Sequence, residues 1–397
     1  MIGFAADHTN VEGFKMSEEH RNDWDPQDPS ILADQRREYD RMREQCPVAH
    51  SEFMGWSLFQ HEDIAAVLGD TDTYSNASRF LAIPNGMDPP IHGRYRAALE
   101  PNFTEAQMTK IEPHARQIAV NHLQPLLSAG KTEFMAAFAM PYAMKTLCSV
   151  LGWPEQHWEC LGGWTHDSQQ AAFNKDPVAG KALANLFSEH VKANLTAHRT
   201  TANDKSDTDA TDQLLSTQVD GVQLDDEHIV SVLRNWAAGH GTVIAALGNI
   251  VLHLARDHQL QDQLRRDPTL IPATIEEVLR VDGPLVANRR TTTGEVKIQG
   301  RVIPKGESLS LMWIAANRDP RVFADAHKVK IERNNESNLV WGQGIHVCMG
   351  ISLARLELRV AIEELLAHTT HFDFAGDAPE RTVYPSNGLA RLPLQLS

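Results

Sequence analysis

A cysteine near the end of the chain stands in a run whose residue types suit metal binding. The run reads WGQGIHVCMG over residues 341–350, with Cys348 just before an apolar segment at 351–366. A thiol at a helix N-terminus gains from the positive end of the helix dipole, which lowers its pKa and favours a thiolate ligand. The three glycines let the backbone turn sharply and let a large flat ligand approach closely. A buried packing cysteine is the ordinary alternative, but it does not explain three glycines and a histidine at these offsets.

A second constellation lies in the middle of a long apolar segment, residues 225–257, which predicts a helix. At about 1.5 Å per residue such a helix would cross a domain, so its middle must be buried. That middle reads Ala-Gly-His-Gly-Thr over residues 238–242, and each glycine costs roughly 1 kcal/mol of helix stability relative to alanine. Close helix packing would explain the glycines. Alternatively the helix is widened here, so that Thr242 bonds back to the carbonyl of Ala238 or out to a ligand.

The cysteine run resembles the haem-binding signature of the cytochrome P450 family, which reads aromatic, Gly, any, Gly, any, His, any, Cys, any, Gly. It matches at every fixed position except the first, where the family usually has Phe and this chain has Trp341. The resemblance implies that the Cys348 thiolate ligates the iron of haem b, with Gly342 and His346 in the same cofactor-binding loop. The indole N–H of Trp341 is then expected to donate toward the sulfur or a propionate.

The same resemblance gives the long helix a catalytic role. The family carries a Gly, any, acid, Thr stretch over the iron, which forms its oxygen-binding groove, and Thr242 falls on the alcohol. Gly241 falls on the acid, so the usual acid relay for protons is missing. His240 is the nearest titratable substitute in the sequence.

Glu277 and Arg280 lie three residues apart in a helix expected over residues 272–281. By themselves they could be a surface ion pair worth a few tenths of a kcal/mol. Beside the cysteine loop they resemble the family's buried Glu and Arg, which brace that loop together with a third arginine, here Arg333. The resemblance therefore implies a structural role for these three residues.

Four side chains are expected to hold the haem propionates. His92 and Arg96 are four residues apart on one helical face, for which a solvated basic face is the ordinary interpretation. In the family a His and an Arg at these positions contact the propionates, as do the motif histidine, His346, and an arginine in the strand after the Glu277 helix. That arginine is Arg290, with Arg289 the less fitting alternative. Charge-assisted hydrogen bonds to two carboxylates are strong, which makes the set chemically reasonable.

The substrate pocket is implied by position alone. The loop over residues 74–84 is shorter than the family's usual loop, so the pocket is expected to be more open, or else roofed by residues 169–176. Its expected lining mixes apolar with amide and hydroxyl groups, which is typical of a small-molecule site. The residues expected to line it, beside Thr242, are Phe80, Leu81, Ala237, Ala238, Leu285, Val286, Asn288, Ser386 and Asn387.

The elements that position these residues are mostly helices. Apolar periodicity predicts helices over residues 28–44, 61–68, 108–128, 134–151, 156–170, 180–198 and 225–257, and strands over residues 296–298, 302–303 and 392–396. The predicted fold is mainly α: a cytochrome P450 fold, with a helical bundle and a smaller peripheral β-sheet region. No repeat or linker divides the 397 residues, so we expect one haem domain over 1–397, with residues 28–396 covered by the resemblance and 1–27 as an N-terminal extension.

Charge and composition indicate which classes of binding partner are not expected. A net charge of −15 argues against nucleic acid binding. Residues 1–16 have no apolar signal-like stretch, and nowhere are there about 18 consecutive apolar residues, so a cytoplasmic protein without a membrane anchor is expected. The four cysteines have unrelated spacings, which favours neither zinc nor disulfides, and those other than Cys348 are expected to be inert packing residues.

The expected function is that of a haem-thiolate monooxygenase. It would insert one oxygen atom from O2 into a C–H bond of a small organic substrate, by hydroxylation or O-dealkylation. Electrons would come from a separate ferredoxin and its reductase, or a flavodoxin. Two alternatives stay open from the sequence: a peroxide-driven oxygenase, suggested by Gly241, and a haem-binding sensor or carrier without turnover.

Overall fold

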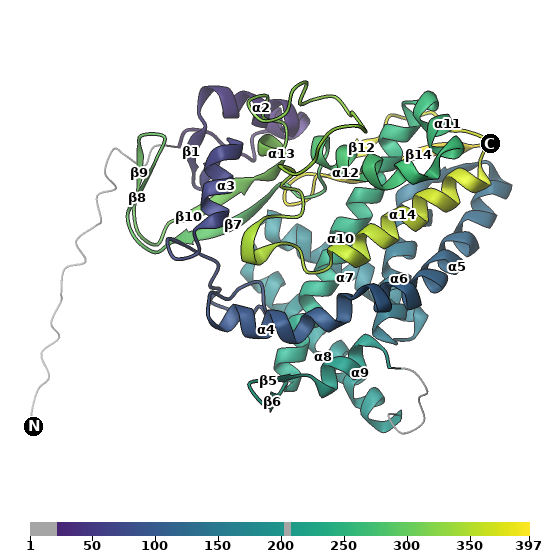
Figure 1. Ribbon diagram of the computed structural model, residues 1–397, viewed down its shortest axis with the longest axis horizontal. Helices are drawn as coiled ribbons and strands as arrows, with labels where there is room; N and C mark the ends of the chain where they lie inside the picture. Colours follow the sequence, from purple (N-terminus) through teal and green to yellow (C-terminus); the bar gives the residue numbers. More distant parts are fainter. Residues whose placement is uncertain (1–21, 202–207) are drawn as a thin grey trace, which may run out of the picture.

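The computed structural model describes residues 22–201 and 208–397. It has a large helical body and smaller sheets, so the prediction of a mainly α fold is confirmed (Figure 1). Most of the N-terminal extension expected over residues 1–27, and part of a polar loop at 200–211, lie outside the described residues. The helices are α1 (Pro29–Ala33), α2 (Gln35–Gln45), α3 (His61–Gly69), α4 (Ile91–Leu99), α5 (Glu105–Ala129), α6 (Met140–Leu151), α7 (Trp158–Phe173), α8 (Pro177–Thr201), α9 (Ala210–Ser216), α10 (Asp226–Ala255), α11 (His258–Arg266), α12 (Ile271–Val281), α13 (Trp313–Ala316) and α14 (Ile351–His368).

Two expected helices differ from the sequence prediction. The helix expected over residues 28–44 is broken at Asp34, whose backbone is not helical and whose side chain caps the start of α2 by accepting from the Arg37 N–H. The helix expected over residues 134–151 begins with a π-helical stretch, Met135–Ala139, before α6. Glu133 accepts from the first backbone N–H groups of that stretch, which caps it.

Within residues 22–201 and 208–397 the strands form five separate sheets. The largest has the order β1-β2-β10-β7-β3, in which β2 and β10 are parallel and the other neighbours antiparallel. A three-stranded sheet has the order β11-β14-β4, and three two-stranded sheets pair β5 with β6, β8 with β9 and β12 with β13. Their bounds are β1 (Val48–Ser51), β2 (Gly55–Leu58), β3 (Tyr74–Ser75), β4 (Lys131–Glu133), β5 (Gln218–Val219), β6 (Val222–Gln223), β7 (Ala287–Thr292), β8 (Val296–Ile298), β9 (Arg301–Ile303), β10 (Ser308–Met312), β11 (Phe372–Phe374), β12 (Glu380–Arg381), β13 (Leu389–Arg391) and β14 (Pro393–Leu396).

Helix α10 is the central element of the helical body, and α14 crosses it near the middle of Figure 1. Asp225 starts α10 by accepting from the His228 N–H, and acidic residues occupy its first turn, where the helix dipole favours them. Among the described residues α10 alone is long and apolar enough to span a membrane. Most of its apolar window is buried by neighbouring helices, as in the core helix of a globular protein.

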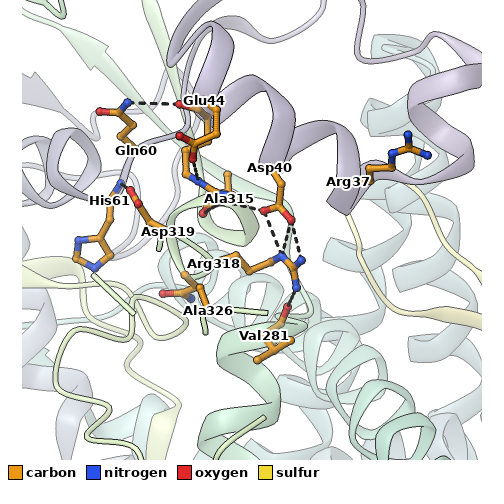
Figure 2. Close-up of polar contacts among 12 residues, drawn as sticks. Arg37, Asp40, Glu44, Gln60, His61, Val281, Ala315, Arg318, Asp319 and Ala326 are labelled. Atoms are coloured by element: carbon orange, nitrogen blue, oxygen red, sulfur yellow. Dashed lines mark hydrogen bonds and ion pairs between the residues drawn. The ribbon is translucent and has the colours of Figure 1, made fainter. Parts of the chain in front are cut away.

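A polar network joins the largest sheet region to the helical body (Figure 2). Asp40 on α2 accepts from Arg318, which follows α13, at 2.7 Å between Nη2 and Oδ2. Arg43 also binds Asp40 and donates to the carbonyl of Ala315 at 2.9 Å. Since α13 directly follows β10, this network fixes the sheet that carries β7 against the end of α12.

Candidate functional site

A cavity of about 750 Å³ lies among the middle of α10, the start of α14, strand β7 and the loop before α14. Its volume is in the range of small-molecule sites. Residues 75–78, 82 and 84–86, at the end of β3 and after it, close another side of the cavity. The lining includes Cys348, Trp341, Gly342, His346, Thr242, His240, Ala238, Leu285, Asn288, Arg289, Arg290 and Glu357. The structure thus brings the cysteine loop and the middle of the long helix to one cavity, although they are about a hundred residues apart.

Cys348 reaches the cavity because its loop turns sharply before α14. Gly342 and Gly344 both have positive φ, 73° and 71°, a conformation that favours glycine. A Cβ added to Gly344 would come within 2.8 Å of the carbonyl oxygen of Leu68, so this position also needs glycine for space. The Cys348 N–H donates to the carbonyl of Trp341, which closes the loop.

The pKa of the Cys348 thiol differs from the sequence expectation. Burial raises it, although the Gly350 N–H and the charges of Arg96 and Arg355 act in the opposite direction. The helix terminus therefore does not by itself produce a thiolate here, and the prediction of a lowered pKa is wrong for the protein alone. A coordinated metal ion deprotonates a thiol outright, so a bound metal would reverse this state.

A cluster of donors stands beside the cysteine loop. The rings of His92 and His346 are 4.3 Å apart, and the Nε2 atoms of both are buried without a hydrogen-bond partner among the described residues. Burial, together with the charges of His92, Arg290 and Arg96, lowers the pKa of His346 to about 4. Arg290 is 6% exposed and donates to Asn76, while Arg96 donates to the carbonyl of Val347 at 2.6 Å. Crowded donors of this kind need an anionic partner.

These observations fit a haem. The orphaned imidazole nitrogens and Arg290 would donate to two propionates, the turn at Gly342 leaves room for a flat ring, and Cys348 supplies one soft ligand. Arg289 also lines the cavity, but it is exposed and donates to the Tyr384 hydroxyl at 2.9 Å. The geometry therefore favours Arg290 over Arg289 as the propionate arginine.

Helix α10 carries Thr242 into the cavity without a break in its α-helical assignment. The Thr242 hydroxyl donates to the carbonyl of Gly239 at 2.6 Å, and not to that of Ala238 as expected. Gly241 does not line the cavity: a Cβ there would lie 2.7 Å from the methyl group of Thr165 on α7. Close packing therefore explains Gly241, whereas nothing lies within 4 Å of a Cβ at Gly239.

Gln169, one of the residues expected to roof the pocket, lies near Gly241 instead. Its Nε2 would be 3.1 Å from a Cβ at that position. None of residues 169–176 lines the cavity, whose side near β3 is formed by residues 75–78, 82 and 84–86. The roof expectation is wrong because α7 packs against α10 rather than over the cavity.

His240 points into the core from the same turn of α10, yet it also borders the cavity. Its Nδ1 lies 2.8 Å from the carbonyl of Trp236, and its Nε2 lies 3.1 Å from Glu357 Oε1 on α14. Burial by itself would lower the pKa of His240, but the charge and hydrogen bond of Glu357 outweigh it and raise this pKa. Sequence reasoning missed Glu357, which had no signal beyond its place in an amphipathic helix.

The Glu277 and Arg280 side chains are both fully buried. Their bidentate pair has distances of 2.8 and 2.9 Å, and Arg333 binds Glu277 Oε1 at 2.9 Å. Arg280 also donates to the backbone carbonyls of Asn317, Ala326 and Lys328. The three residues thus tie α12 to the long segment that leads into the cysteine loop.

The indole of Trp341 does not donate toward the sulfur or a propionate. Its Nε1 donates to Glu276 Oε2 at 2.8 Å, and the Arg355 guanidinium lies over its ring at 5.6 Å. Glu276 also binds Arg355 at 2.7 Å. Because this acid lies on α12, it turns the indole N–H away from the cavity and anchors the cysteine loop from a second side.

Several predicted pocket residues lie elsewhere. Phe80 is 80% exposed and Leu81 is 42% exposed, and neither lines the cavity. Ala237, Val286, Ser386 and Asn387 are buried against other parts of the protein; Asn387, for example, donates to Asp282 at 2.9 Å. Ala238, Leu285, Asn288 and Thr242 do line it. The cavity residues that the sequence analysis missed include Asn76, Asn85, Trp236, Val243, Ala246, Trp313, Glu357 and Tyr384.

Comparisons with known proteins show the family to which this chain belongs. A family model described as Cytochrome P450 matches residues 173–396. The chain is 31% identical over 343 residues to the erythromycin C-12 hydroxylase of Saccharopolyspora erythraea, which covers 82% of this chain and 85% of that protein. It is 30% identical to the cyclomarin C epoxidase CymV of Salinispora arenicola, over 84% of this chain and 89% of that one. A solved structure of a P450 EryK mutant in complex with erythromycin B has a TM-score of 0.83 at 27% identity, over 91% of this chain and 96% of that one.

Proposed function

Because this chain belongs to the cytochrome P450 family of haem-thiolate monooxygenases, we propose that it oxidises a small organic molecule at a C–H bond. The products would be those of hydroxylation or O-dealkylation. The observation that carries the proposal is that Cys348, His346, Arg290 and Thr242 line one cavity. His92 contacts His346, and Arg96 donates to the carbonyl of Val347, so both lie beside this lining. Cys348 would hold the haem as a thiolate, and the haem would supply the chemistry of oxygen activation, which a thiolate ligand favours.

The chain's own residues would bind and orient the reactants. His92, Arg96, Arg290 and His346 would fix the propionates by charge-assisted hydrogen bonds. Thr242 would offer its hydroxyl to dioxygen, and the apolar lining would exclude bulk water. We infer that residues 28–396 work as one haem domain, because α10, α12, α14 and β7 all contribute to the same cavity.

Substrate size and chemistry follow from the cavity and the relatives. The cavity must hold the porphyrin as well as the substrate, and its 750 Å³ is in the range of small-molecule sites. Amide groups of Asn76, Asn85 and Asn288 interrupt an otherwise apolar lining, which would orient a substrate with a few polar groups. The relatives named for erythromycin and cyclomarin C support a secondary metabolite.

We expect a screen of such compounds to identify the substrate by a shift of the ferric haem from low to high spin. Compounds that shift the spin state should also accelerate NADH consumption when a ferredoxin and its reductase are added, because electrons must come from a separate donor. A protein that shifts its spin state but forms product only with hydrogen peroxide would support the peroxide-driven alternative. Spin shifts without product in either case would favour a sensor. The cell compartment in this proposal is the cytoplasm, where such donors occur.

Replacing Thr242 by alanine is expected to uncouple the reaction. The Thr242 hydroxyl is a side-chain donor of α10 that lines the cavity, and a positioned proton donor contributes about 10²–10⁴-fold. Because water can replace part of this role, we expect product per NADH to fall about tenfold, with hydrogen peroxide rising in proportion. Haem content and substrate binding should survive.

Thr146→Ala is the matched control for Thr242→Ala. Thr146 also donates from a helix to a backbone carbonyl, that of Tyr142 at 2.9 Å, but it is fully buried in α6 away from the cavity. Product per NADH should be unchanged in this control. Tight coupling retained in Thr242→Ala would place the proton route elsewhere.

A further inference from the structure

His240 and Glu357 form a buried pair between the two helices that enclose the cavity. His240 on α10 is 6% exposed, and Glu357 on α14 is fully buried. Both residues line the cavity, and 3.1 Å separates His240 Nε2 from Glu357 Oε1. A buried acid and base at this place need a reason, because their desolvation is costly.

The hydrogen bonds determine how many protons the pair holds. The carbonyl of Trp236 can only accept, so at 2.8 Å from it the Nδ1 of His240 must carry a hydrogen. A hydrogen bond between Nε2 and a carboxylate oxygen then requires one further proton, either on the imidazole or on the carboxyl group. In both arrangements, imidazolium with carboxylate or imidazole with carboxylic acid, the two residues share one proton that can move between them.

Glu357 has a second oxygen whose needs are not met. Its Oε2 is buried and has no hydrogen-bond partner among the described residues. A buried acceptor of this kind costs free energy unless a donor reaches it. The Tyr142 hydroxyl does not serve, because it donates to the backbone carbonyl of Glu357 at 2.8 Å. The free oxygen therefore suits a water molecule in contact with the cavity.

Among the described residues, the side chains packed directly against the His240–Glu357 pair are uncharged. Tyr142 on α6 has a pKa well above its usual value, mainly because it is buried, so it stays neutral. On α7, the nearest side chains to this turn of α10 are Thr165 and Gln169, which carry no charge. Besides Glu357, the charged groups that act on Tyr142 are Arg116, Arg359 and Glu363, and both arginines bind Glu363.

We propose that the His240–Glu357 pair supplies protons to the cavity in place of the acidic side chain that is missing at position 241. This inference rests on the proposed monooxygenase function, in which one substrate, one O2, two electrons and two protons give the hydroxylated product and water. The electrons come from the ferredoxin-type donor. Each proton leaves the pair through water at Glu357 and is replaced from solvent water. Position 241, where the family has its acid, faces α7. We therefore assign the proton supply to His240, the preceding residue, which borders the cavity.

The test compares Glu357→Gln and His240→Gln with His253→Gln. Glutamine is close in size to either side chain and can form a hydrogen bond, but it cannot carry the shared proton. His253 is the matched control: it lies on the same helix and pairs with a buried carboxylate, Asp282 Oδ2, at 3.2 Å, but it does not line the cavity. We expect product per NADH to fall at least fivefold in both pair variants and to stay unchanged in His253→Gln, with haem content retained in all three.

Peroxide-driven turnover separates proton supply from a merely structural role. Hydrogen peroxide brings its own electrons and protons, so one substrate and one peroxide give product and water without the pair. We therefore expect peroxide-driven product formation by Glu357→Gln to stay within twofold of the unmodified protein. Equal losses with NADH and with peroxide would mean that the pair only holds α10 to α14, and would overturn the inference.

A second measurement needs no substrate. Nitrogen NMR of histidine-labelled protein, in its reduced carbon monoxide form, should give a His240 pKa above the ordinary value of about 6.5. In Glu357→Gln this pKa should fall below that value, because burial, the largest effect, is then opposed only by the hydrogen bond to the Trp236 carbonyl. An unchanged His240 pKa would overturn the inference. Failure to oxidise any compound in either drive mode would instead count against the proposed function, and the titration would then decide the inference alone.

Discussion

Cys348→Ala is expected to abolish the red-shifted absorption band that the reduced protein forms with carbon monoxide. That band would arise from a haem whose iron is held by a cysteine thiolate, and Cys348 is the cysteine that lines the cavity among the described residues. Without it, any haem retained should absorb like a histidine- or water-ligated haem. The loss should be essentially complete, and monooxygenase activity should be lost with it. Absorption spectra of the reduced protein with and without carbon monoxide measure this directly.

Cys148→Ala provides the control for this experiment. Cys148 is fully buried in α6 and does not line the cavity, so it cannot reach a cofactor bound there. The band should persist in this variant. An unchanged band in Cys348→Ala would end the assignment of the ligand. Cys160, expected to be a packing residue, is exposed in α7 and lies outside the cavity lining.

The sequence predicted the elements of the site better than its lining. Glycine spacing around Cys348 and apolar periodicity in α10 are local signals, so the loop, both helices and the mainly α fold could be predicted. The direction of a side chain depends on neighbours far along the chain. Trp341 turns to Glu276, sixty-five residues earlier, and no pattern within its own loop indicates this.

The prediction of the pocket residues was partly wrong for the same reason, because their positions depend on contacts far along the chain. Phe80 lies in a loop whose path is fixed by distant contacts: Ser231 and Arg234 on α10 both donate to the carbonyl of Leu81. Gly241 could be read as a missing acid, but only the packing of Thr165 from α7 explains why no side chain fits there. Glu357 was missed because its partner, His240, is 117 residues away.

Glu277→Ala is expected to cost about 3–5 kcal/mol of stability, because it leaves the buried guanidinium of Arg280 without its counter-charge. The pKa of the Glu277 carboxyl lies below its ordinary value: burial would raise it, but hydrogen bonds from Arg280 and Arg333 outweigh that effect. A lowered pKa means that this contribution is present above the unfolded pKa and is lost as pH falls through the folded one. Chemical unfolding at pH 7 should show the loss of stability in Glu277→Ala, and unfolding at acid pH should show a smaller difference between the variant and the unmodified protein. The variant should also incorporate haem poorly.

Glu38→Ala is the matched control for the brace. Glu38 and Arg41 have the same three-residue spacing on α2 and a 2.7 Å contact, but the Arg41 side chain is 46% exposed. Water can solvate the remaining charge there, so the loss should be only a few tenths of a kcal/mol. If Glu277→Ala lost no more than Glu38→Ala and bound haem fully, the carbonyls of Asn317, Ala326 and Lys328 would suffice to satisfy Arg280, and the cysteine loop would not depend on the acid. A difference of several kcal/mol would show that burial, and not the three-residue spacing, gives this pair its strength.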